Sequence, residues 1–475
     1  MSGPAVTPRD SACVTVGDGC RWLKVLLMRR HLSVLILSLS LCAGASAQQR
    51  GRAAGTQTRK PVSEVNEVAA PNPNQLVAIL GATLVDGRGG APVRDSAVIV
   101  RGERIIDAGP RGSVRVPAGA EVFDAKGLTL LPGLIDAHFH LDGDDGLPAL
   151  FLSHGVTALR DPGQWVEAYE TVRRSSVQVP RLFLTGPHID SPPAAYPADS
   201  FVVRDAEEAR LAVERFADGG ASAIKIYFRL PVGLIAAVNE AAHARGLPTT
   251  AHLEIVDATD AVRAGVDGIE HVTSFGTALL PPREAEKYRQ AVLADNAARR
   301  EGRYAVWGAA DLEGARARSL IALLAGRGTY VSPTLAIFER RAGDKDTTEV
   351  HLRGFKKMLD FTGRARRAGV RVVVGSHSAV PHAQRGWAYQ RELELLVEAG
   401  LTPSEVIVAA TLENARFFRV EDRIGSVERG KLADLLLVEG DPLSDVRAMR
   451  NVRRVMLGGR WVAPSPAEKP AGGGR

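Results

Sequence analysis

The sequence predicts an α/β protein built on a parallel (β/α)8 barrel, with β segments flanking the barrel at both ends of the chain. Short apolar runs alternate with helical patterns rich in Ala, Glu, Arg and Leu, at the pitch of strand–helix units. Eight such runs occur, which suits a closed barrel better than an open sheet. They are Leu130–Asp136, Val156–Leu159, Arg181–Leu184, Ala223–Tyr227, Pro248–Ala251, Gly268–Glu270, Thr329–Ser332 and Arg371–Val374.

The composition is that of a soluble globular protein with a large core. Of 475 residues, 45% are hydrophobic and 24% are charged, and the formal net charge is +6. No run of basic residues is long enough to follow a phosphate backbone, so the expected partner is a small-molecule substrate and not nucleic acid. A homo-oligomer is compatible with the sequence. The three cysteines, Cys13, Cys20 and Cys42, lie near the N-terminus, so a metal further along must be held by His, Asp, Glu or Lys.

Residues 1–47 have the features of an export signal. Arg29 and Arg30 precede the apolar run Leu32–Leu41, and Ala45-Ser46-Ala47 supply a small-residue cleavage site. The apolar run is too short to span a bilayer, so no membrane span is expected. The mature protein is therefore expected to be secreted or periplasmic.

Two details refine this N-terminal prediction. A signal that begins at Met28 has the usual length, which would make residues 1–27 an upstream extension. A lipoprotein anchored at Cys42 is the less favoured alternative, because Leu41 stands where a small residue is expected.

Changes in sequence texture divide the rest of the chain. Residues 48–74 are rich in Gly, Ala, Pro, Asn, Arg and Gln and predict a disordered linker. Short alternating strands follow, and strand texture returns after the barrel. An inserted helical excursion is expected between Thr277 and Ser319. The predicted divisions are a β part at 75–130, the barrel at 131–415, a second β part at 416–463 and a disordered tail at 464–475.

Two histidines follow the first candidate strand at a spacing that suits a metal ion. His138 and His140 end the stretch Leu134-Ile135-Asp136-Ala137-His138-Phe139-His140. Side chains on a strand alternate, so these two point to the same side. Two unrelated histidines at a strand edge are the alternative, because short motifs often occur by chance.

Chemically unusual residues mark three further strands. Ile224-Lys225-Ile226 places a lysine inside an apolar strand, where an unpaired ammonium is costly to bury. A buried salt bridge is the alternative explanation for Lys225. His252 and His271 each end a candidate strand, and barrel enzymes place their catalytic groups at strand carboxyl ends. Spacings of about one strand–helix unit put these residues in one barrel, and together with the first two histidines they indicate one site.

These residues and two longer motifs resemble the amidohydrolase superfamily, in particular its secreted imidazolonepropionase-like and prolidase-like metal-dependent hydrolases. Leu131–His140 resembles the superfamily's first-strand motif, and Gly425–Leu436 resembles its return into a composite β-sandwich. The match extends over most of the chain beyond the signal. The resemblance implies a TIM barrel with a flanking β-sandwich built from N- and C-terminal segments.

The resemblance also implies a metal site. His138 and His140 would bind one divalent ion, His252 and His271 a second, and Lys225, carboxylated by carbon dioxide, would bridge them. A carbamate is an anionic oxygen ligand, so it removes the buried positive charge and holds two cations together. One or two zinc ions are expected, although iron, manganese, cobalt and nickel accept the same ligands. The ions would polarise a carbonyl and lower the pKa of bound water to about 7, so that a C–N bond is hydrolysed.

The sequence departs from the family pattern at the eighth strand. Val372-Val373-Val374-Gly375-Ser376-His377-Ser378 has His377 where relatives usually have an aspartate that ligates a metal and moves the proton. An imidazole serves as a ligand or as a base, but seldom as both, because coordination occupies the lone pair that a base needs.

Three hypotheses for this position stay open. His377 ligates the first metal while a group such as Glu254 shuttles protons. Alternatively, His377 is the catalytic base and the first metal lacks one ligand. In the third hypothesis the site binds metal and substrate with little turnover.

Weaker candidates lie near other strand ends. His188 is placed to contact substrate and Tyr227 to donate a hydrogen bond to an oxyanion, although either residue also suits a loop cap. His382 follows the eighth strand and is a minor candidate. Asp142 is expected to be a solvated loop acid, with attraction of a cationic substrate end as the alternative.

Two functions of different class follow from the sequence. The first is a secreted metallohydrolase that cleaves a C–N bond in an amide, a peptide or a cyclic amide, with lactonase or esterase activity as a chemical variant. The second is a catalytically weak binding protein outside the cytoplasm that keeps the fold and part of the metal site. His377 discriminates between them.

Overall fold

The computed structural model describes residues 63–463. The predicted extension and signal at 1–47, and the predicted tail at 464–475, lie outside the described residues. Among residues 63–463, no helix is both long enough and apolar enough to cross a bilayer.

Eight parallel strands form the barrel where the apolar runs predict them. Three belong to the sheet β7-β8-β9 and five to a seven-stranded sheet. The Ser222 N–H donates to the Leu184 carbonyl and the Ala137 N–H to the Val374 carbonyl, so the two sheets are joined on both sides and the barrel is closed. The strands are β7 (Leu134–Asp136), β8 (Val156–Asp161), β9 (Arg181–Leu184), β12 (Ile224–Ile226), β13 (Thr249–His252), β14 (Gly268–Glu270), β15 (Tyr330–Ser332) and β16 (Arg371–Val372).

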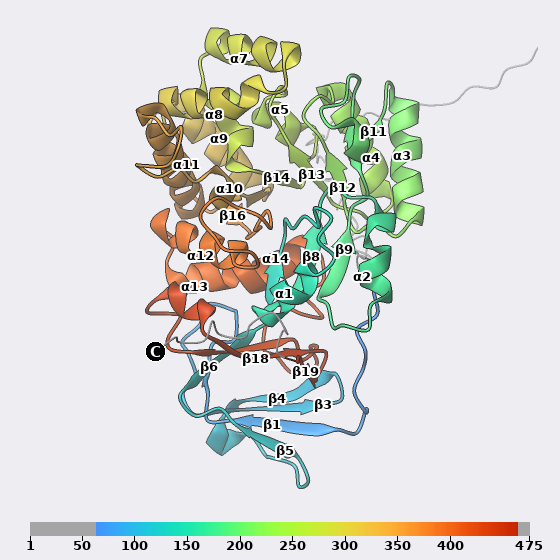
Figure 1. Ribbon diagram of the computed structural model, residues 1–475, viewed down its shortest axis with the longest axis vertical. Coiled ribbons are helices and arrows are strands. Elements are labelled where there is room, and N and C mark those ends of the chain that lie inside the picture. The colour runs from blue at the N-terminus through green and yellow to red at the C-terminus, as the bar shows by residue number, and fades with distance from the viewer. Residues whose placement is uncertain (1–62, 464–475) are drawn as a thin grey trace, which may run out of the picture. The chain divides into compact units, whose positions relative to one another are not determined.

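Helices cover the outside of the barrel and bury apolar side chains against it (Figure 1). The expected excursion is confirmed as the four helices α6 to α9, between β14 and β15. The longer helices include α3 (Ala206–Asp218), α4 (Val232–Ala244), α7 (Pro282–Ala294), α8 (Ala298–Ala309), α9 (Ala315–Arg327), α11 (Glu349–Arg367) and α12 (Ala388–Glu398). The shorter ones are α1 (Leu147–Ser153), α2 (Glu170–Arg174), α5 (Ala258–Arg263), α6 (Gly276–Leu279), α10 (Leu335–Phe338), α13 (Pro403–Val408) and α14 (Asn414–Phe417).

Residues before and after the barrel form two sheets that share one core, as a composite sandwich requires. The four-stranded sheet has the order β4-β3-β1-β5, and the five-stranded sheet has the order β19-β18-β17-β6-β2. Antiparallel pairing of β6 with β17 joins the N-terminal strands to the C-terminal ones (Figure 1). The strands are β1 (Leu76–Leu80), β2 (Thr83–Leu84), β3 (Ser96–Arg101), β4 (Arg104–Pro110), β5 (Glu121–Asp124), β6 (Leu128–Pro132), β17 (Leu435–Glu439), β18 (Val452–Leu457) and β19 (Arg460–Trp461). The predicted fold class, a barrel with a flanking sandwich, is confirmed.

The expected first barrel strand, Leu130–Asp136, is divided between the two modules. Its first half ends β6 in the sandwich, and its second half is β7 in the barrel. The change of sheet occurs at Gly133, where a Cβ atom would lie 2.1 Å from Thr157 Oγ1 on the neighbouring strand β8. Only glycine permits this close approach, so a run that is continuous in sequence becomes two strands.

The prediction of a disordered linker at 48–74 is wrong for Glu64, Val65 and Asn66, which contact the barrel. Val65 donates its N–H to the Leu182 carbonyl, and Asn66 bonds to the backbone of Pro180 and Leu182 on either side of Arg181. Glu64 pairs with Arg181 at 3.1 Å. This short segment is polar and has no periodic apolar pattern, so sequence texture gives no sign that it docks along β9.

Candidate metal centre

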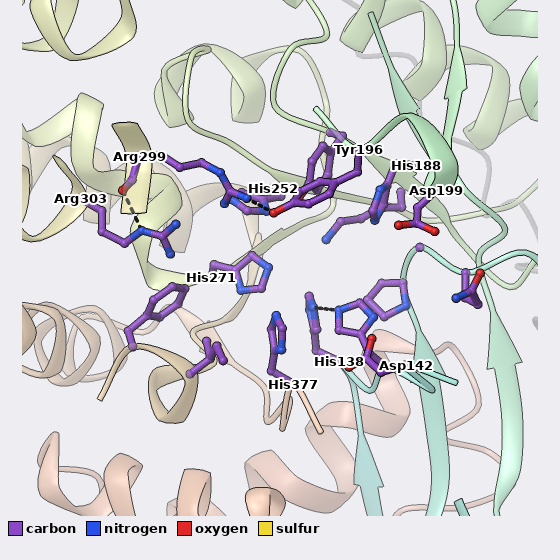
Figure 2. A pocket seen from close by; sticks show the side chains of 18 residues that line it. His138, Asp142, His188, Tyr196, Asp199, His252, His271, Arg299, Arg303 and His377 are labelled. Atoms are coloured by element: carbon purple, nitrogen blue, oxygen red, sulfur yellow. Dashed lines mark hydrogen bonds between the residues drawn. The ribbon is translucent and has the colours of Figure 1, made fainter. Parts of the chain in front are cut away.

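All eight side chains that the sequence nominates line one pocket at the carboxyl ends of the barrel strands (Figure 2). Parallel strands of a barrel end at the same face, which is why residues up to 239 positions apart in the chain meet there. The eight residues are His138, His140, His188, Lys225, Tyr227, His252, His271 and His377.

His138 and His140 face each other across 3.0 Å, from Nε2 to Nε2. The Nδ1 atom of His138 is 2.7 Å from Glu270 Oε2, and the Nδ1 atom of His140 is 3.2 Å from Asp161 Oδ1. A carboxylate only accepts hydrogen bonds, so each Nδ1 carries the proton and each Nε2 presents a lone pair. Two lone pairs at this distance repel unless a cation or a shared proton lies between them, and carboxylate-bound imidazoles are the usual arrangement around a metal.

The two supporting carboxylates are held firmly in place. Glu270 is fully buried and also accepts from Arg160 Nη2 at 2.9 Å and from Thr250 Oγ1 at 2.7 Å. Asp161 accepts in addition from the Leu141 N–H and from the Tyr169 hydroxyl, on its other oxygen. These bonds fix the two imidazole rings before any ligand arrives.

His377 lies with this pair. One ligand atom from each of His138, His140 and His377 falls within 4.8 Å of the others, a spacing that suits a single ion. The ring of His377 stacks on that of His138, with centroids 5.3 Å apart. Its N–H donates to the His138 carbonyl at 2.7 Å, and its φ of 58° is a rare conformation for a residue with a side chain.

The strained turn at His377 is held by a buried acid. Asp136 accepts from the backbone N–H groups of Ser376 and His138, and from the Ser376 hydroxyl at 2.5 Å. Burial raises the pKa of Asp136 to about 6, even though these hydrogen bonds favour its charged form. The turn therefore brings His377 to the first-strand histidines.

His252 and His271 form the other side of the pocket. Their ring centroids are 4.5 Å apart, and His271 Nδ1 is 2.7 Å from Thr334 Oγ1. His252 Nε2 is 3.3 Å from Glu254, which also accepts from the Tyr288 hydroxyl. Glu254 is buried behind His252 and is not among the pocket-lining residues, so the structure does not favour it as a proton shuttle to substrate.

Lys225 lines the same pocket and is buried without a direct partner for its amine. Its side chain is 1% exposed, and Nζ has no hydrogen-bond partner among the described residues. Burial lowers the pKa of Lys225 to about 8, with Glu270 opposing the shift. The alternative explanation from sequence was that Lys225 forms a buried salt bridge. Lys225 forms no ion pair within residues 63–463, and Glu270 is paired with Arg160 instead.

The electrostatics keep most of the imidazoles neutral. Burial lowers the pKa of His138, His271 and His377 well below the ordinary value, and that of His252 to about 4. His140 differs, because Asp161 outweighs the effect of burial and raises its pKa. Neutral imidazoles with free lone pairs are the form that a metal binds.

Of the four weaker candidates, His188, Tyr227 and Asp142 line the pocket and His382 does not. His188 and Tyr227 stack on each other at 4.2 Å. His382 is not among the pocket-lining residues and instead places Nε2 3.0 Å from Asp344. Its expected minor role at the mouth of the site is therefore wrong.

The sequence interpretation missed the residues that support and surround the histidines. Arg160, Asp161 and Glu270 are charged residues in apolar strands, which is the same signal that singled out Lys225. Arg299 and Arg303 line the pocket from α8, within the excursion to which no function was given. An i, i+4 arginine pair on a helix is common on surfaces, so the sequence holds no distinctive signal for it.

A model of the amidohydrolase family matches residues 129–462. The chain belongs to the amidohydrolase family. This confirms the predicted resemblance and enzyme class, and the family is generally metal dependent.

Curated relatives match shorter segments. An N-acyl-D-aspartate deacylase from Alcaligenes xylosoxydans xylosoxydans is 39% identical over 115 residues, which are 23% of this chain and 21% of that relative. An imidazolonepropionase from Desulfotalea psychrophila is 46% identical over 41 residues, which are 9% of this chain and 10% of the relative. In the matched segments the chain thus spans 21% of the length of the first relative and 10% of the second.

Solved structures match nearly the whole fold. A putative prolidase from Bifidobacterium longum is 26% identical, with a TM-score of 0.64, and the match covers 84% of this chain and 97% of that one. A Xaa-Pro dipeptidase with bound methionine in its active site has the same TM-score at 22% identity, covering 82% of this chain and 99% of that one. The second likeness supports the fold alone.

Proposed function

We propose that this protein is a metal-dependent hydrolase that cleaves a C–N bond in an amide, a peptide or a cyclic amide. The observation that carries the proposal is the convergence of six histidines in one pocket with a buried lysine whose Nζ has no hydrogen-bond partner among the described residues. The relatives support the bond type, since deacylase and prolidase are names for enzymes that hydrolyse C–N bonds.

His138, His140 and His377 are proposed to hold one divalent ion. Their ligand atoms lie within 4.8 Å of one another, and two of the rings are fixed through Nδ1 by buried carboxylates. A set of three imidazoles suits zinc, which is the ion we propose. This arrangement supports the first of the three hypotheses for His377, in which it is a ligand and not the base.

Lys225, carboxylated on Nζ, is proposed to hold a second ion together with His252 and His271. The buried amine has no partner among the described residues, and its pKa of about 8 leaves part of it neutral near pH 7. A neutral amine is the form that adds to carbon dioxide, and the resulting anion ends the cost of burying a cation. These features of the pocket support the proposal of a second ion and of a carboxylated Lys225.

When bound, the metal supplies a Lewis acid that polarises a carbonyl and lowers the pKa of coordinated water. The chain's own residues provide the surroundings of the reacting group. Burial raises the pKa of Tyr227 far above its usual value, so its hydroxyl stays protonated and can donate to the carbonyl oxygen. Burial keeps His188 neutral, and its Nδ1 atom has no partner within the described residues, so His188 can accept a hydrogen bond from a donor on the substrate.

A panel of substrates tests the proposal. The purified protein, expressed from residue 48 with and without zinc and bicarbonate, is assayed on N-acetyl amino acids, Xaa-Pro dipeptides and hydantoins. We expect turnover of at least one class, loss of turnover after chelation, and recovery when zinc is restored. No turnover in any class, with metal bound, would contradict the hydrolase and favour the binding protein.

Export from the cytoplasm is part of the same proposal. It is supported by the basic residues, the apolar run and the small-residue cleavage site at 29–47. Cell fractionation of the full-length chain, followed by N-terminal sequencing of the mature protein, tests it. We expect a new N-terminus at Gln48.

A further inference from the structure

Two arginines in the pocket carry charges that the protein does not neutralise. Arg299 and Arg303 lie one turn apart on α8 and both line the pocket beside His252 and His271 (Figure 2). Neither forms an ion pair within residues 63–463, whereas arginines elsewhere in the fold, such as Arg181 and Arg391, are paired with acids.

Arg299 is the more informative of the two. It is 7% exposed, and its Nε atom has no hydrogen-bond partner among the described residues. The guanidinium donates to the Tyr196 hydroxyl and packs over the Tyr196 and Phe228 rings, at 5.4 and 5.3 Å. Ring faces and one hydroxyl offset only part of the cost of burying a cation.

Arg303 is fixed beside it. Its Nε atom donates to the Arg299 carbonyl at 3.0 Å, and its guanidinium packs over the Phe338 ring at 5.1 Å. Glu254 interacts electrostatically with both arginines, but it is already engaged by Tyr288 and His252. The remaining donors of two guanidinium groups are therefore available at this end of the pocket.

The charges of the pocket are separated. Asp142 and Asp199 line the opposite side, next to His138 and His188 (Figure 2). An anion is consequently attracted to the α8 end and repelled from the other end. The pocket can distinguish the two ends of a substrate by charge.

We propose that Arg299 and Arg303 bind a carboxylate of the substrate, so that the protein hydrolyses C–N bonds in compounds that end in a free carboxylate, such as N-acyl amino acids or peptides with a free C-terminus. The inference rests on the proposed function, because it concerns the same pocket. Guanidinium groups match a carboxylate with two parallel hydrogen bonds, and these bonds are strong in a buried setting. The carboxylate then fixes which end of the substrate lies at α8.

Matched substrate pairs test this assignment. Each N-acetyl amino acid and Xaa-Pro dipeptide is compared with its carboxamide, which has the same shape without the charge. We expect kcat/KM for the acid to exceed that for the amide by roughly 10- to 100-fold, mainly through KM. Arg303→Gln abolishes this preference and Arg303→Lys keeps part of it. Arg300→Gln, an exposed arginine on the same helix, leaves it unchanged.

The outcomes separate this inference from the function it depends on. Hydrolysis of acids and amides at equal rates, or an unchanged preference in Arg303→Gln, would overturn the carboxylate site and leave the hydrolase intact. If no compound is hydrolysed, the affinities of the same acid and amide pairs, measured by calorimetry, test the carboxylate site. Tighter binding of the acid, lost in Arg303→Gln, supports the site, and equal binding or no binding overturns it. Melting temperatures show that each variant is folded, and Arg299→Gln serves as the second variant.

Discussion

At the residue scale, the centre is defined by which nitrogen each histidine presents. Glu270 and Asp161 accept hydrogen bonds from the Nδ1–H groups of His138 and His140, which leaves the two Nε2 lone pairs facing each other. His377 joins them through a strained turn that Asp136 holds. A coordinated imidazole has no lone pair left for base catalysis, so the proposed role of His377 as a ligand leaves the proton transfer to another group.

Replacing Asp161 tests how much the orientation of His140 matters. Asp161→Asn keeps the shape of the side chain but allows its amide to donate toward Nδ1, which disfavours the tautomer that presents Nε2. We expect the affinity for zinc to fall roughly 10- to 100-fold while the melting temperature of the metal-free protein changes little. Competition with a zinc-binding dye measures the affinity. Unchanged affinity would mean that His140 does not bind the metal.

Removing the Lys225 amine tests the carbamate. Lys225→Ala leaves a gap where the anionic ligand would be, so we expect loss of the second ion and of turnover. Short carboxylates such as acetate or propionate supply an anionic oxygen in that gap and should restore part of both. Acetamide has the same size and no charge, and serves as the control. Equal rescue by acetamide, or full activity without rescue, would contradict a carboxylated lysine.

The sequence predicted those site residues whose type is unusual for their local sequence, and it missed those whose type is common there. A lysine in an apolar strand and histidines at strand ends are rare, so Lys225 and His271 stood out. Arg299 is one of many arginines in helical segments, and only its burial in the folded chain makes it notable. Glu270 was overlooked beside His271, although a buried glutamate in a strand is just as costly as a buried lysine.

At the element scale, α12 supports the rim of the pocket. Glu392 is fully buried and accepts the N–H groups of Leu335 and Ala336 at the start of α10. Arg391 beside it binds Glu339 through two nitrogens, just after α10. The loop held in this way carries Thr334, which bonds to His271, and Phe338, which lines the pocket.

The ionisation of Glu392 makes this support sensitive to pH. Burial raises its pKa from 4.5 to about 8, against the two backbone hydrogen bonds. The folded protein then binds this proton more tightly than the unfolded chain does, so the contribution to stability is full below pH 4.5 and is lost as the pH rises to about 8. The stability of the native chain relative to Glu392→Gln should fall across that interval. Thermal unfolding at closely spaced pH values measures it, and a flat difference would contradict the raised pKa.

Element positions were predicted closely, because eight apolar runs with helical sequence between them leave few alternatives to a barrel. The division of the first run at Gly133 was not predictable, since it depends on the nearby Thr157 side chain of a strand more than twenty residues away. The same holds for β10 (His188–Asp190) and β11 (Ser200–Val202), which extend the sheet beside β12. These features depend on contacts between elements that are distant in the chain, and the local sequence pattern carries no information about such contacts.

At the scale of the whole molecule, one buried ion pair joins the two modules. Arg181 begins barrel strand β9, and its Nε and Nη2 atoms bond to both oxygens of Asp434, which precedes sandwich strand β17. Asp434 also accepts from the Gly458 N–H at 2.7 Å. Glu64, from the segment expected to be a linker, pairs with the same arginine.

Breaking this pair should weaken the whole fold and not one module. Asp434→Ala leaves Arg181 buried with Glu64 alone, which we expect to cost about 3 to 5 kcal/mol of unfolding free energy. Glu439→Ala removes a surface pair with Arg453, in which both side chains are more than half exposed, and should cost less than about 1 kcal/mol. Denaturant unfolding measures both variants. Two separate transitions in Asp434→Ala would contradict coupling of the modules through this contact.

The central claim is that His377 is a working metal ligand in the place of the usual aspartate. Elemental analysis of the purified protein, saturated with zinc and bicarbonate and then dialysed, tests it most directly. We predict about two ions per chain in the native protein and about one in His377→Ala, with His377→Asp retaining two. Less than one ion per chain in the native protein, restored to two by His377→Asp, would contradict the claim and identify a site that has lost its metal chemistry.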